Sequence, residues 1–255
     1  MSMWGIAGAA GATAAMLAAG AIARGALIKT STLLAPSIWQ GPPHRPVIAL
    51  TFDDGPSEST LALLEILDRH NVKATFFQCG FSVHRLPAVA KEVSVRGHEL
   101  GNHTYSHPRL WLKSSWFIYR ELANAQKAIR EATGVNPKLF RAPFGLRWIG
   151  LRRAQKRLGL TGVLWSTIGF DWLWPPESIV RHLLAQARNG SIICLHDGRR
   201  LKKAPDISAT LAAVQAIIPA VLERGFQFET VSQMIASGVA DVGNQPCPER
   251  FSTST

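Results

Sequence analysis

A regular alternation of short apolar runs and longer segments of helical period is the feature that most constrains the fold of this chain. The apolar runs are rich in Val, Ile, Leu and Phe, and each is paired with a helical segment. They lie at residues 47–52, 74–80, 98–103, 139–145, 162–169, 191–197 and 226–231. Repeated βα units predict a parallel sheet, either closed into a barrel or open and doubly wound. With 255 residues, 47% of them hydrophobic, the chain is long enough to bury the core of either fold.

Polar residues favour the barrel. They follow nearly every predicted strand at its carboxyl end, where a (β/α) barrel gathers its active site. A doubly wound sheet would concentrate them at one switch point. We therefore predict an α/β fold, an irregular parallel (β/α) barrel of seven strands.

The residues at the predicted strand ends are acids, histidines and one arginine. They are Asp53, Asp54, His103, His107, Arg141, Asp171 and His196. Each alone has an ordinary explanation, since a DDG sequence is most often a turn and a lone histidine is commonly structural. A barrel would bring all of them to one rim, and together they predict an active site.

Two patterns among these residues predict their arrangement. His103 and His107 have the i, i+4 spacing of one helical face, and two imidazoles with one carboxylate are a common ligand set for catalytic zinc. Asp53 and Asp54 are adjacent like charges, and neighbouring strand residues point to opposite faces. We interpret Gly55-Pro56 as the sharp turn that lets both carboxylates reach one site.

The motifs TFDDG, H-T-x-x-H, R-x-P-x-G, D-W and L-H-D occur in this order within residues 46–235. In these motifs the chain resembles the NodB-homology polysaccharide deacetylases, carbohydrate esterase family 4. The resemblance implies metal-dependent hydrolysis of the N-acetyl group of an aminosugar, in a polysaccharide or a lipid-linked saccharide. It implies one divalent ion bound by Asp54, His103 and His107, with zinc expected and cobalt, manganese or nickel as alternatives.

The resemblance also implies the acid–base groups. Asp53 would be the general base, held ionised by Arg141, and His196 the general acid, its imidazolium stabilised by Asp171. Such a separation of base and acid is what amide hydrolysis requires, since a water must lose a proton and a poor leaving group must gain one.

Substrate-binding positions follow from the same resemblance, with departures from the family pattern. Trp172 would line the groove, and the backbone N–H near Phe144, where a tyrosine is frequent, would help to stabilise the oxyanion. Cys194 stands where a leucine usually walls the acetyl pocket, and Ile168 stands where many members carry an aspartate. The Cys194 departure leaves formyl as an alternative to acetyl.

The two ends of the chain differ from the middle. Residues 3–23 carry no charge and are long enough to cross a bilayer, and Arg24 and Lys29 follow them. We expect residues 1–35 to form a membrane anchor, with a cleaved signal peptide or a soluble helical arm as alternatives. Residues 36–46 are predicted to be a proline-rich linker, 47–236 the deacetylase domain, and 237–255 a disordered tail. We expect a protein of the cell-envelope membrane, on a side that the sequence leaves open.

The net charge of +11 suggests an anionic partner. The basic residues are scattered and accompany no nucleic-acid motif, so we interpret them first as solvated basic faces, with a membrane surface or an anionic wall polymer as the alternative partner, and we expect no nucleic acid. Three cysteines without a CxxC pattern predict no disulfide framework. Two other functions stay open: a catalytically idle carbohydrate-binding protein on the same fold, and a formamide or cyclic-imide hydrolase of the superfamily.

Overall fold

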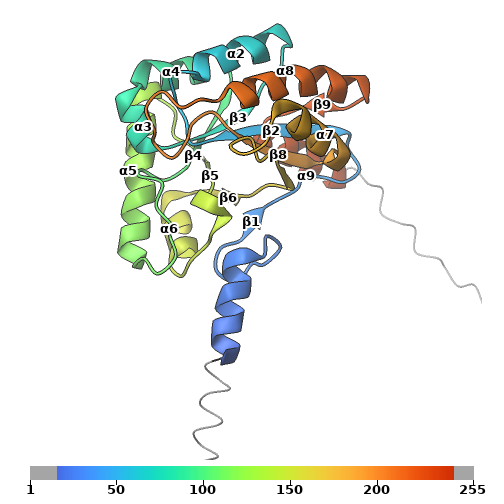
Figure 1. Ribbon diagram of the computed structural model, residues 1–255. Helices are drawn as coiled ribbons and strands as arrows, with labels where there is room; N and C mark the ends of the chain where they lie inside the picture. The colour runs from blue at the N-terminus through green and yellow to red at the C-terminus, as the bar shows by residue number, and fades with distance from the viewer. Residues whose placement is uncertain (1–15, 244–255) are drawn as a thin grey trace, which may run out of the picture.

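The computed structural model describes residues 16–243 and shows a curled parallel sheet surrounded by helices (Figure 1). The strands are β1 (Ser37–Ile38), β2 (Val47–Asp53), β3 (Thr75–Gln78), β4 (Glu99–Asn102), β5 (Leu139–Phe140), β6 (Thr161–Val163), β7 (Thr167–Ile168), β8 (Ser191–His196) and β9 (Gln227–Phe228). The helices are one over residues 16–27, then α2 (Thr60–Arg69), α3 (Gly80–Arg85), α4 (Pro87–Val95), α5 (Ser115–Thr133), the 3₁₀ turn η1 (Pro143–Gly145), α6 (Leu151–Leu158), α7 (Pro176–Gln186), α8 (Ser208–Glu223) and α9 (Val231–Gly243). The predicted irregular parallel (β/α) barrel is confirmed.

The described residues form nine strands, in place of the seven predicted. The apolar run at 162–169 divides into β6 and β7, and β1 forms inside the proline-rich segment by pairing with β6. Strands of two residues are too short to show an alternating pattern, so the sequence does not reveal them.

The sheet curls because its ends are tied together by the chain. Its strand order is β1-β6-β5-β4-β3-β2-β8-β7, with β9 beside β2. Although β6 and β7 lie on either side of the run β5-β4-β3-β2-β8, only residues 164–166 connect them. A connection of this length spans at most about 14 Å. The two sides of the sheet must therefore approach each other, and the carboxyl ends of the strands surround one opening.

The buried strand β2 fixes the direction of Asp53. Three of its side chains point outward and pack against the surrounding helices: Ile48, Leu50 and Phe52. Val47 and Ala49 point inward and pack inside the barrel with residues of α9. Since side chains alternate along a strand, Asp53 points into the barrel at its carboxyl end.

The segment before β2 is packed on the domain by a buried arginine. Arg147 is 1% exposed, and its guanidinium donates to the carbonyl oxygens of Ser31 (2.6 Å), Ala35 (3.2 Å) and Ile28. The predicted linker is therefore not a free tether, since residues on both sides of Pro36 are fixed to the barrel.

The structure describes only part of each end of the chain for which the sequence made a prediction. Within residues 16–243 no helix is long and apolar enough to span a bilayer, and residues 1–15 of the expected anchor lie outside the described part. The predicted disordered tail is corrected, since α9 continues to Gly243; residues 244–255 also lie outside.

Replacement of Arg147 tests its role in holding the N-terminal segment. Arg147→Met leaves buried carbonyl oxygens without donors, so we expect the free energy of unfolding to fall by about 2–3 kcal/mol. Proteolysis within residues 28–35 should become faster. The exposed Arg152→Met is the control and should change stability by less than about 0.5 kcal/mol. Equal stability of the two variants in denaturant titrations would contradict this role.

Candidate active site

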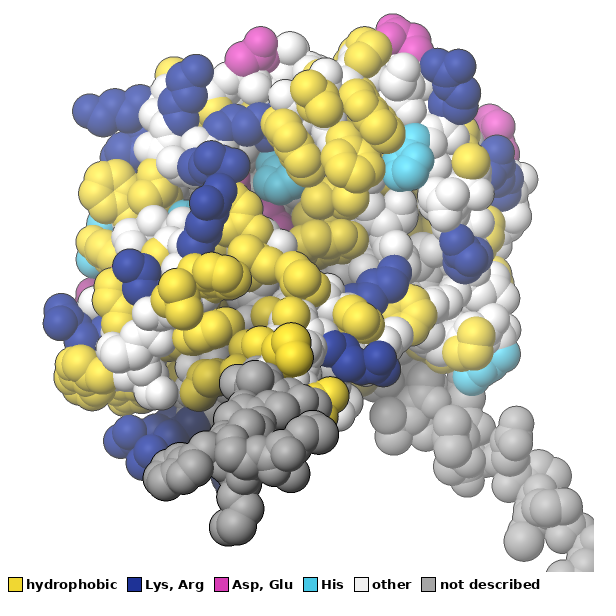
Figure 2. Space-filling model, turned by 60° about the horizontal axis from the view of Figure 1, so that its bottom comes forward, with side chains coloured by type: hydrophobic (Ala, Val, Ile, Leu, Met, Phe, Trp, Pro, Cys, Tyr) yellow, Lys and Arg dark blue, Asp and Glu magenta, His cyan; other side chains and the backbone are white. Residues whose placement is uncertain are grey.

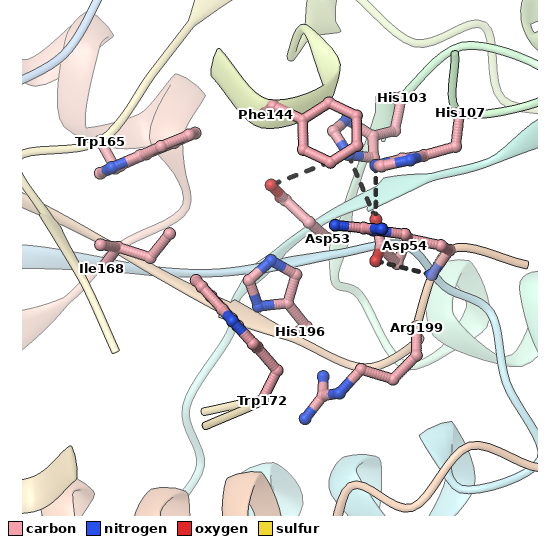
Figure 3. A pocket seen from close by; sticks show the side chains of 11 residues that line it. Asp53, Asp54, His103, His107, Phe144, Trp165, Ile168, Trp172, His196 and Arg199 are labelled. Atoms are coloured by element: carbon pink, nitrogen blue, oxygen red, sulfur yellow. Dashed lines mark hydrogen bonds and ion pairs between the residues drawn. The ribbon is translucent and has the colours of Figure 1, made fainter. Parts of the chain in front are cut away.

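A cleft of about 440 Å³ opens at the carboxyl ends of the strands (Figure 3). Its lining combines ionisable and aromatic side chains: Asp53, Asp54, His103, His107, Phe144, Trp165, Ile168, Trp172, His196, Arg199 and Arg200. Seven of the ten predicted site residues are in this lining. Arg141, Asp171 and Cys194 lie behind it and contact members of the lining.

The adjacent acids reach one cleft because the backbone reverses at the second of them. Asp53 ends β2, whereas Asp54 has a left-handed φ of 73°, which aspartate tolerates better than most residues. Gly55 is needed for close approach, since a Cβ there would lie 2.1 Å from Asp197 Oδ2. The turn that the sequence predicted at Gly55-Pro56 therefore starts at Asp54 itself.

Asp54, His103 and His107 form a cluster that fits a metal ion. Asp54 Oδ1 lies 3.0 Å from His107 Nε2 and 3.4 Å from His103 Nε2. The three ligand atoms lie within 4.8 Å of one another, and the buried Oδ1 has no partner with hydrogen-bond geometry among the described residues. His103 Nδ1 lies 2.8 Å from the Arg141 carbonyl oxygen, to which it donates, so its Nε2 is left with a lone pair toward Asp54. Zn²⁺ commonly binds two imidazoles and a carboxylate arranged in this way.

The two histidines are not on a helix, which corrects the prediction made from their spacing. They lie in the loop after β4, where Thr104 and His107 have φ values of 67° and 52°. Glu121 of α5 accepts from the backbone N–H groups of Tyr105 (3.1 Å) and Ser106 (2.8 Å) and holds this loop. Glu121 could not be predicted as a site residue, because it lies on a helix remote from the motif.

The protonation of Asp54 follows from its surroundings. Burial opposes its ionisation, but the imidazoles of His103 and His107 outweigh burial and hold the pKa of Asp54 well below its ordinary value. Arg200 donates its backbone N–H to Asp54 Oδ2 (2.9 Å). Asp54 is therefore ionised, as a metal ligand must be.

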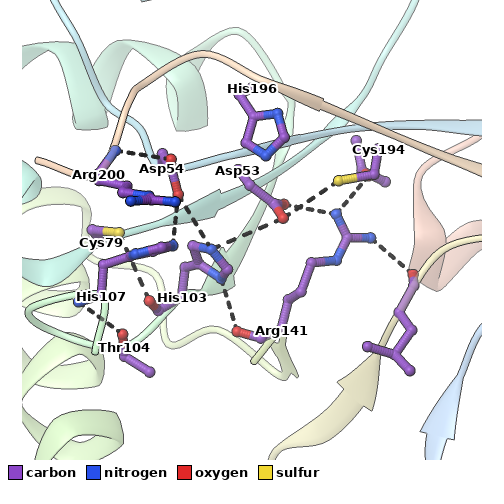
Figure 4. Close-up of polar contacts among 12 residues, drawn as sticks. Asp53, Asp54, Cys79, His103, Thr104, His107, Arg141, Cys194, His196 and Arg200 are labelled. Atoms are coloured by element: carbon purple, nitrogen blue, oxygen red, sulfur yellow. Dashed lines mark hydrogen bonds and ion pairs between the residues drawn. The ribbon is translucent and has the colours of Figure 1, made fainter. Parts of the chain in front are cut away.

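Asp53 has a different partner (Figure 4). The Arg141 guanidinium is fully buried, and its Nη1 donates to Asp53 Oδ1 (2.7 Å) and to Thr51 Oγ1 (2.8 Å). Asp53 Oδ2 lies 3.9 Å from His103 Nε2, beside the metal-ligand cluster. One oxygen of Asp53 is thus fixed by a cation, and the other is directed toward the place where an ion would bind.

His196 and Asp171 form the opposite side of the cleft. Asp171 Oδ1 lies 2.8 Å from His196 Nδ1, and its Oδ2 accepts from Thr210 Oγ1 (2.6 Å). Burial disfavours the imidazolium, but the hydrogen bond and the charge of Asp171 outweigh burial and raise the pKa of His196. The Trp172 ring stands edge-on to the imidazole, with 5.0 Å between the ring centroids. His196 is thereby oriented with Nδ1 toward Asp171 and Nε2 free for the cleft.

Cys194 does not occupy its predicted place in a substrate pocket. Its side chain is fully buried, its Sγ lies 3.5 Å from Asp53 Oδ2, and it is not part of the cleft lining. Burial and then the charge of Asp53 raise the pKa of the thiol well above its ordinary value, so Cys194 is a neutral donor behind Asp53. Trp165 and Ile168 provide the apolar wall in its place.

Comparison with known proteins places this geometry among carbohydrate-active enzymes. The family model described as polysaccharide deacetylase matches residues 40–163. The chain is 37% identical over 201 residues to a peptidoglycan-N-acetylglucosamine deacetylase of Bacillus cereus, covering 77% of this chain and 92% of that protein. It is 37% identical over 191 residues to a chitooligosaccharide deacetylase of Azorhizobium caulinodans, covering 71% and 91% of the two chains.

Two solved structures show the same fold. A peptidoglycan N-acetylglucosamine deacetylase crystallised with 4-naphthalen-1-yl-N-oxidanyl-benzamide superposes with a TM-score of 0.73 at 31% identity, covering 78% of this chain and 92% of that one. A carbohydrate esterase family 4 pseudoenzyme from Bacillus anthracis gives a TM-score of 0.71 at 26% identity, covering 78% of this chain and 68% of that one. The fold alone therefore does not distinguish an active member from an inactive one.

Asp197 has no cationic partner among residues 16–243, and it makes stability depend on pH. Burial first, and then the charges of Asp54 and Asp53, raise its pKa to about 7. The folded protein then holds this proton more tightly than the unfolded chain, so stability is lost as pH rises from about 4 to about 7.

Asp197→Asn keeps an acceptor for the Thr60 hydroxyl, 2.7 Å from Asp197 Oδ2, and removes the titration. We expect Asp197→Asn to gain up to about 3 kcal/mol over the wild type between pH 5 and pH 8 in metal-free denaturant titrations. Parallel pH curves for the two proteins would contradict this account; Asp206→Asn, on the surface, is the control.

Proposed function

Because the chain belongs to the polysaccharide deacetylase family, we propose that it hydrolyses the N-acetyl group of an aminosugar in a polysaccharide or lipid-linked saccharide. The observation that carries this proposal is the separate pairing of the two adjacent acids, Asp54 with two imidazoles and Asp53 with a buried guanidinium. The relatives named for peptidoglycan and chitooligosaccharides support a glycan that contains N-acetylglucosamine.

Asp54, His103 and His107 would hold the divalent ion, for which zinc is the expected metal. A divalent ion in this place supplies a more acidic water and a positive charge beside the amide oxygen. Asp53 would accept a proton from the attacking water at Oδ2, because its Oδ1 is already engaged by Arg141. His196 then donates a proton from Nε2 to the leaving nitrogen. Carbon–oxygen bond formation and carbon–nitrogen cleavage thus end in a carboxylic acid and a free amine.

The rest of the lining suits an acylated sugar. Trp165 and Ile168 give an apolar wall for the acyl methyl group, and Trp172 lies beside His196, where a sugar ring would stack. Phe144, with a left-handed φ of 59°, contacts the His107 ring and keeps its backbone at the edge of the cleft, close to the predicted oxyanion. The relative that is a pseudoenzyme shows that an idle role is available to this fold. The complete set of base, acid and ligands favours activity here.

The two acids give the sharpest test of the proposed roles. In the full chain loaded with Zn²⁺ or Co²⁺, acetate and formate release is measured from a panel of N-acyl glycans. We expect Asp53→Asn to lower kcat/KM by at least about 10²-fold with nearly unchanged metal affinity. Asp54→Asn should weaken metal binding by at least about tenfold, because it removes a ligand.

The outcomes separate the alternatives. If both variants lose metal alike, the division between base and ligand is wrong. Metal binding without release of either acid would indicate an idle binding protein, and formate without acetate would indicate a formamide hydrolase. Asp206→Asn, on the surface, should behave as the wild type.

The role of His196 is tested by the pH dependence of turnover. Since Asp171 raises the pKa of His196, activity should be lost as pH rises through that pKa. Asp171→Asn removes the charge and should move this alkaline limb of kcat/KM to lower pH and reduce kcat by at least about tenfold. An alkaline limb at the same pH in the variant would show that His196 is not the acid.

A further inference from the structure

The helix over residues 16–27 exposes apolar side chains that no part of the described structure covers. Residues 16–23 (MLAAGAIA) contain no polar side chain, and Met16 and Leu17 are 68% and 71% exposed. This helix projects from the domain at the bottom of Figure 1. The exposed Arg24 ends this apolar stretch in the last turn of the helix. A helical stretch that is apolar all round is normally buried in a protein core or in a membrane.

Further apolar side chains are exposed around the base of this helix. We call them the basal surface; its members are Leu27, Leu33, Trp111, Leu112, Trp116 and Ile149. An apolar groove of about 330 Å³ runs between the helix and the Trp111–Trp148 pair, whose ring centroids lie 5.8 Å apart. Figure 2 shows hydrophobic side chains gathered on the same face as the hollow that contains acidic and histidine side chains.

Leu112 shows that this exposure is costly. Its side chain is 67% exposed, and its φ of 56° is one that leucine rarely adopts. Neither packing within the described structure nor backbone preference favours leucine there. An external apolar partner would explain it.

Positive charges lie beside the basal surface. Helix α6 exposes Arg152, Arg153, Lys156 and Arg157, and none of the four forms an ion pair with a described residue. Arg157 lies over the Tyr119 ring, 4.9 Å from its centroid, close to Trp116. Exposed tryptophans beside arginines and lysines are typical of proteins at the surface of an anionic bilayer.

We propose that the basal surface docks on an anionic lipid bilayer, with helix 16–27 directed into it and α6 against the lipid headgroups. A second copy of the chain would also cover apolar side chains. It would, however, bring two α6 clusters together in a protein of net charge +11, which electrostatic repulsion opposes. The inference goes beyond deacetylation, since vesicle binding needs no turnover and its failure would leave the proposed reaction untouched.

A fluorescent label tests which face meets the lipid. Full chains carrying Ile149→Cys or Leu222→Cys, each with Cys247→Ser, are labelled with an environment-sensitive dye; Cys79 and Cys194 are buried. Both labelled positions are exposed, and Leu222 lies on α8 at the opposite end of Figure 1. With vesicles of phosphatidylcholine and phosphatidylglycerol, emission at 149 should shift to the blue and emission at 222 should not. Equal responses, or none at 149, would overturn the proposal.

Leu112→Asn separates docking from folding. Asparagine tolerates the left-handed backbone better than leucine, so the melting temperature should be unchanged or higher. Loss of the apolar contact should weaken vesicle binding by about tenfold. Leu222→Asn is the control for an exposed leucine and should bind as the wild type. Unchanged vesicle binding by Leu112→Asn, with self-association lost in its place, would show that the surface joins two copies of the chain.

Charge removal tests the headgroup contact. The double variant Arg152→Gln, Arg153→Gln should weaken binding to phosphatidylglycerol vesicles by about fivefold for each charge removed. Lys91→Gln with Arg181→Gln removes two exposed charges from α4 and α7 and should have no comparable effect. An equal loss of vesicle binding in both double variants would show that net charge alone attracts the protein to the vesicles. It would overturn the assignment of the headgroup contact to α6.

Discussion

The rest of the site depends on the buried ion pair between the Arg141 guanidinium and Asp53. A buried charge is destabilising unless it is paired and its hydrogen bonds are satisfied. Arg141 meets this requirement with Asp53, Thr51 and the carbonyl oxygen of Leu164, beneath the Phe77 ring 4.1 Å away. Its own carbonyl accepts from His103 and so directs the lone pair of that ligand. One residue after β5 therefore positions the proposed base Asp53, the proposed metal ligand His103 and the connection between β6 and β7.

Four buried acids share this end of the barrel, and each is accommodated differently. Asp53 is paired with Arg141, Asp54 lies between two imidazoles, and Asp171 binds His196. Within the described part of the chain, Asp197 has only hydroxyl and backbone partners. Burial and the neighbouring charges of Asp54 and Asp53 raise its pKa, and no described cation offsets them. The separation of roles among the acids thus follows from which positive or neutral group each one faces.

Much of this arrangement could be predicted from the sequence because it depends on order along strands. The apolar runs and the polar residues after them predicted the parallel barrel, the common rim and five side chains of the cleft lining, and the family resemblance added Phe144 and Trp172. Features that depend on irregular backbone could not be predicted. His103 and His107 have a helical spacing in the sequence but lie in a loop. The backbone reversal after Asp53 depends on the left-handed φ of one residue, Asp54. Cys194 was misplaced because a resemblance gives a position in the chain but not the direction of its side chain. Glu121 holds the histidine loop from a helix whose own sequence shows no catalytic pattern. Asp197 lies in the L-H-D motif, but its burial beside Asp54 depends on how the chain folds around it.

A second buried arginine links the cleft to the proposed membrane face. Arg147 holds the segment after helix 16–27 by three carbonyl oxygens, and it lies only three residues after Phe144 at the edge of the cleft. A flexible linker would have let the domain move away from a bilayer that held its N-terminal helix. With the segment packed on the barrel, the fold would set the height and tilt of the cleft above a bilayer that bound the basal surface. A glycan that reacts in this cleft would therefore have to present its N-acyl group close to the membrane surface, either through attachment to a lipid or as a polymer lying along it.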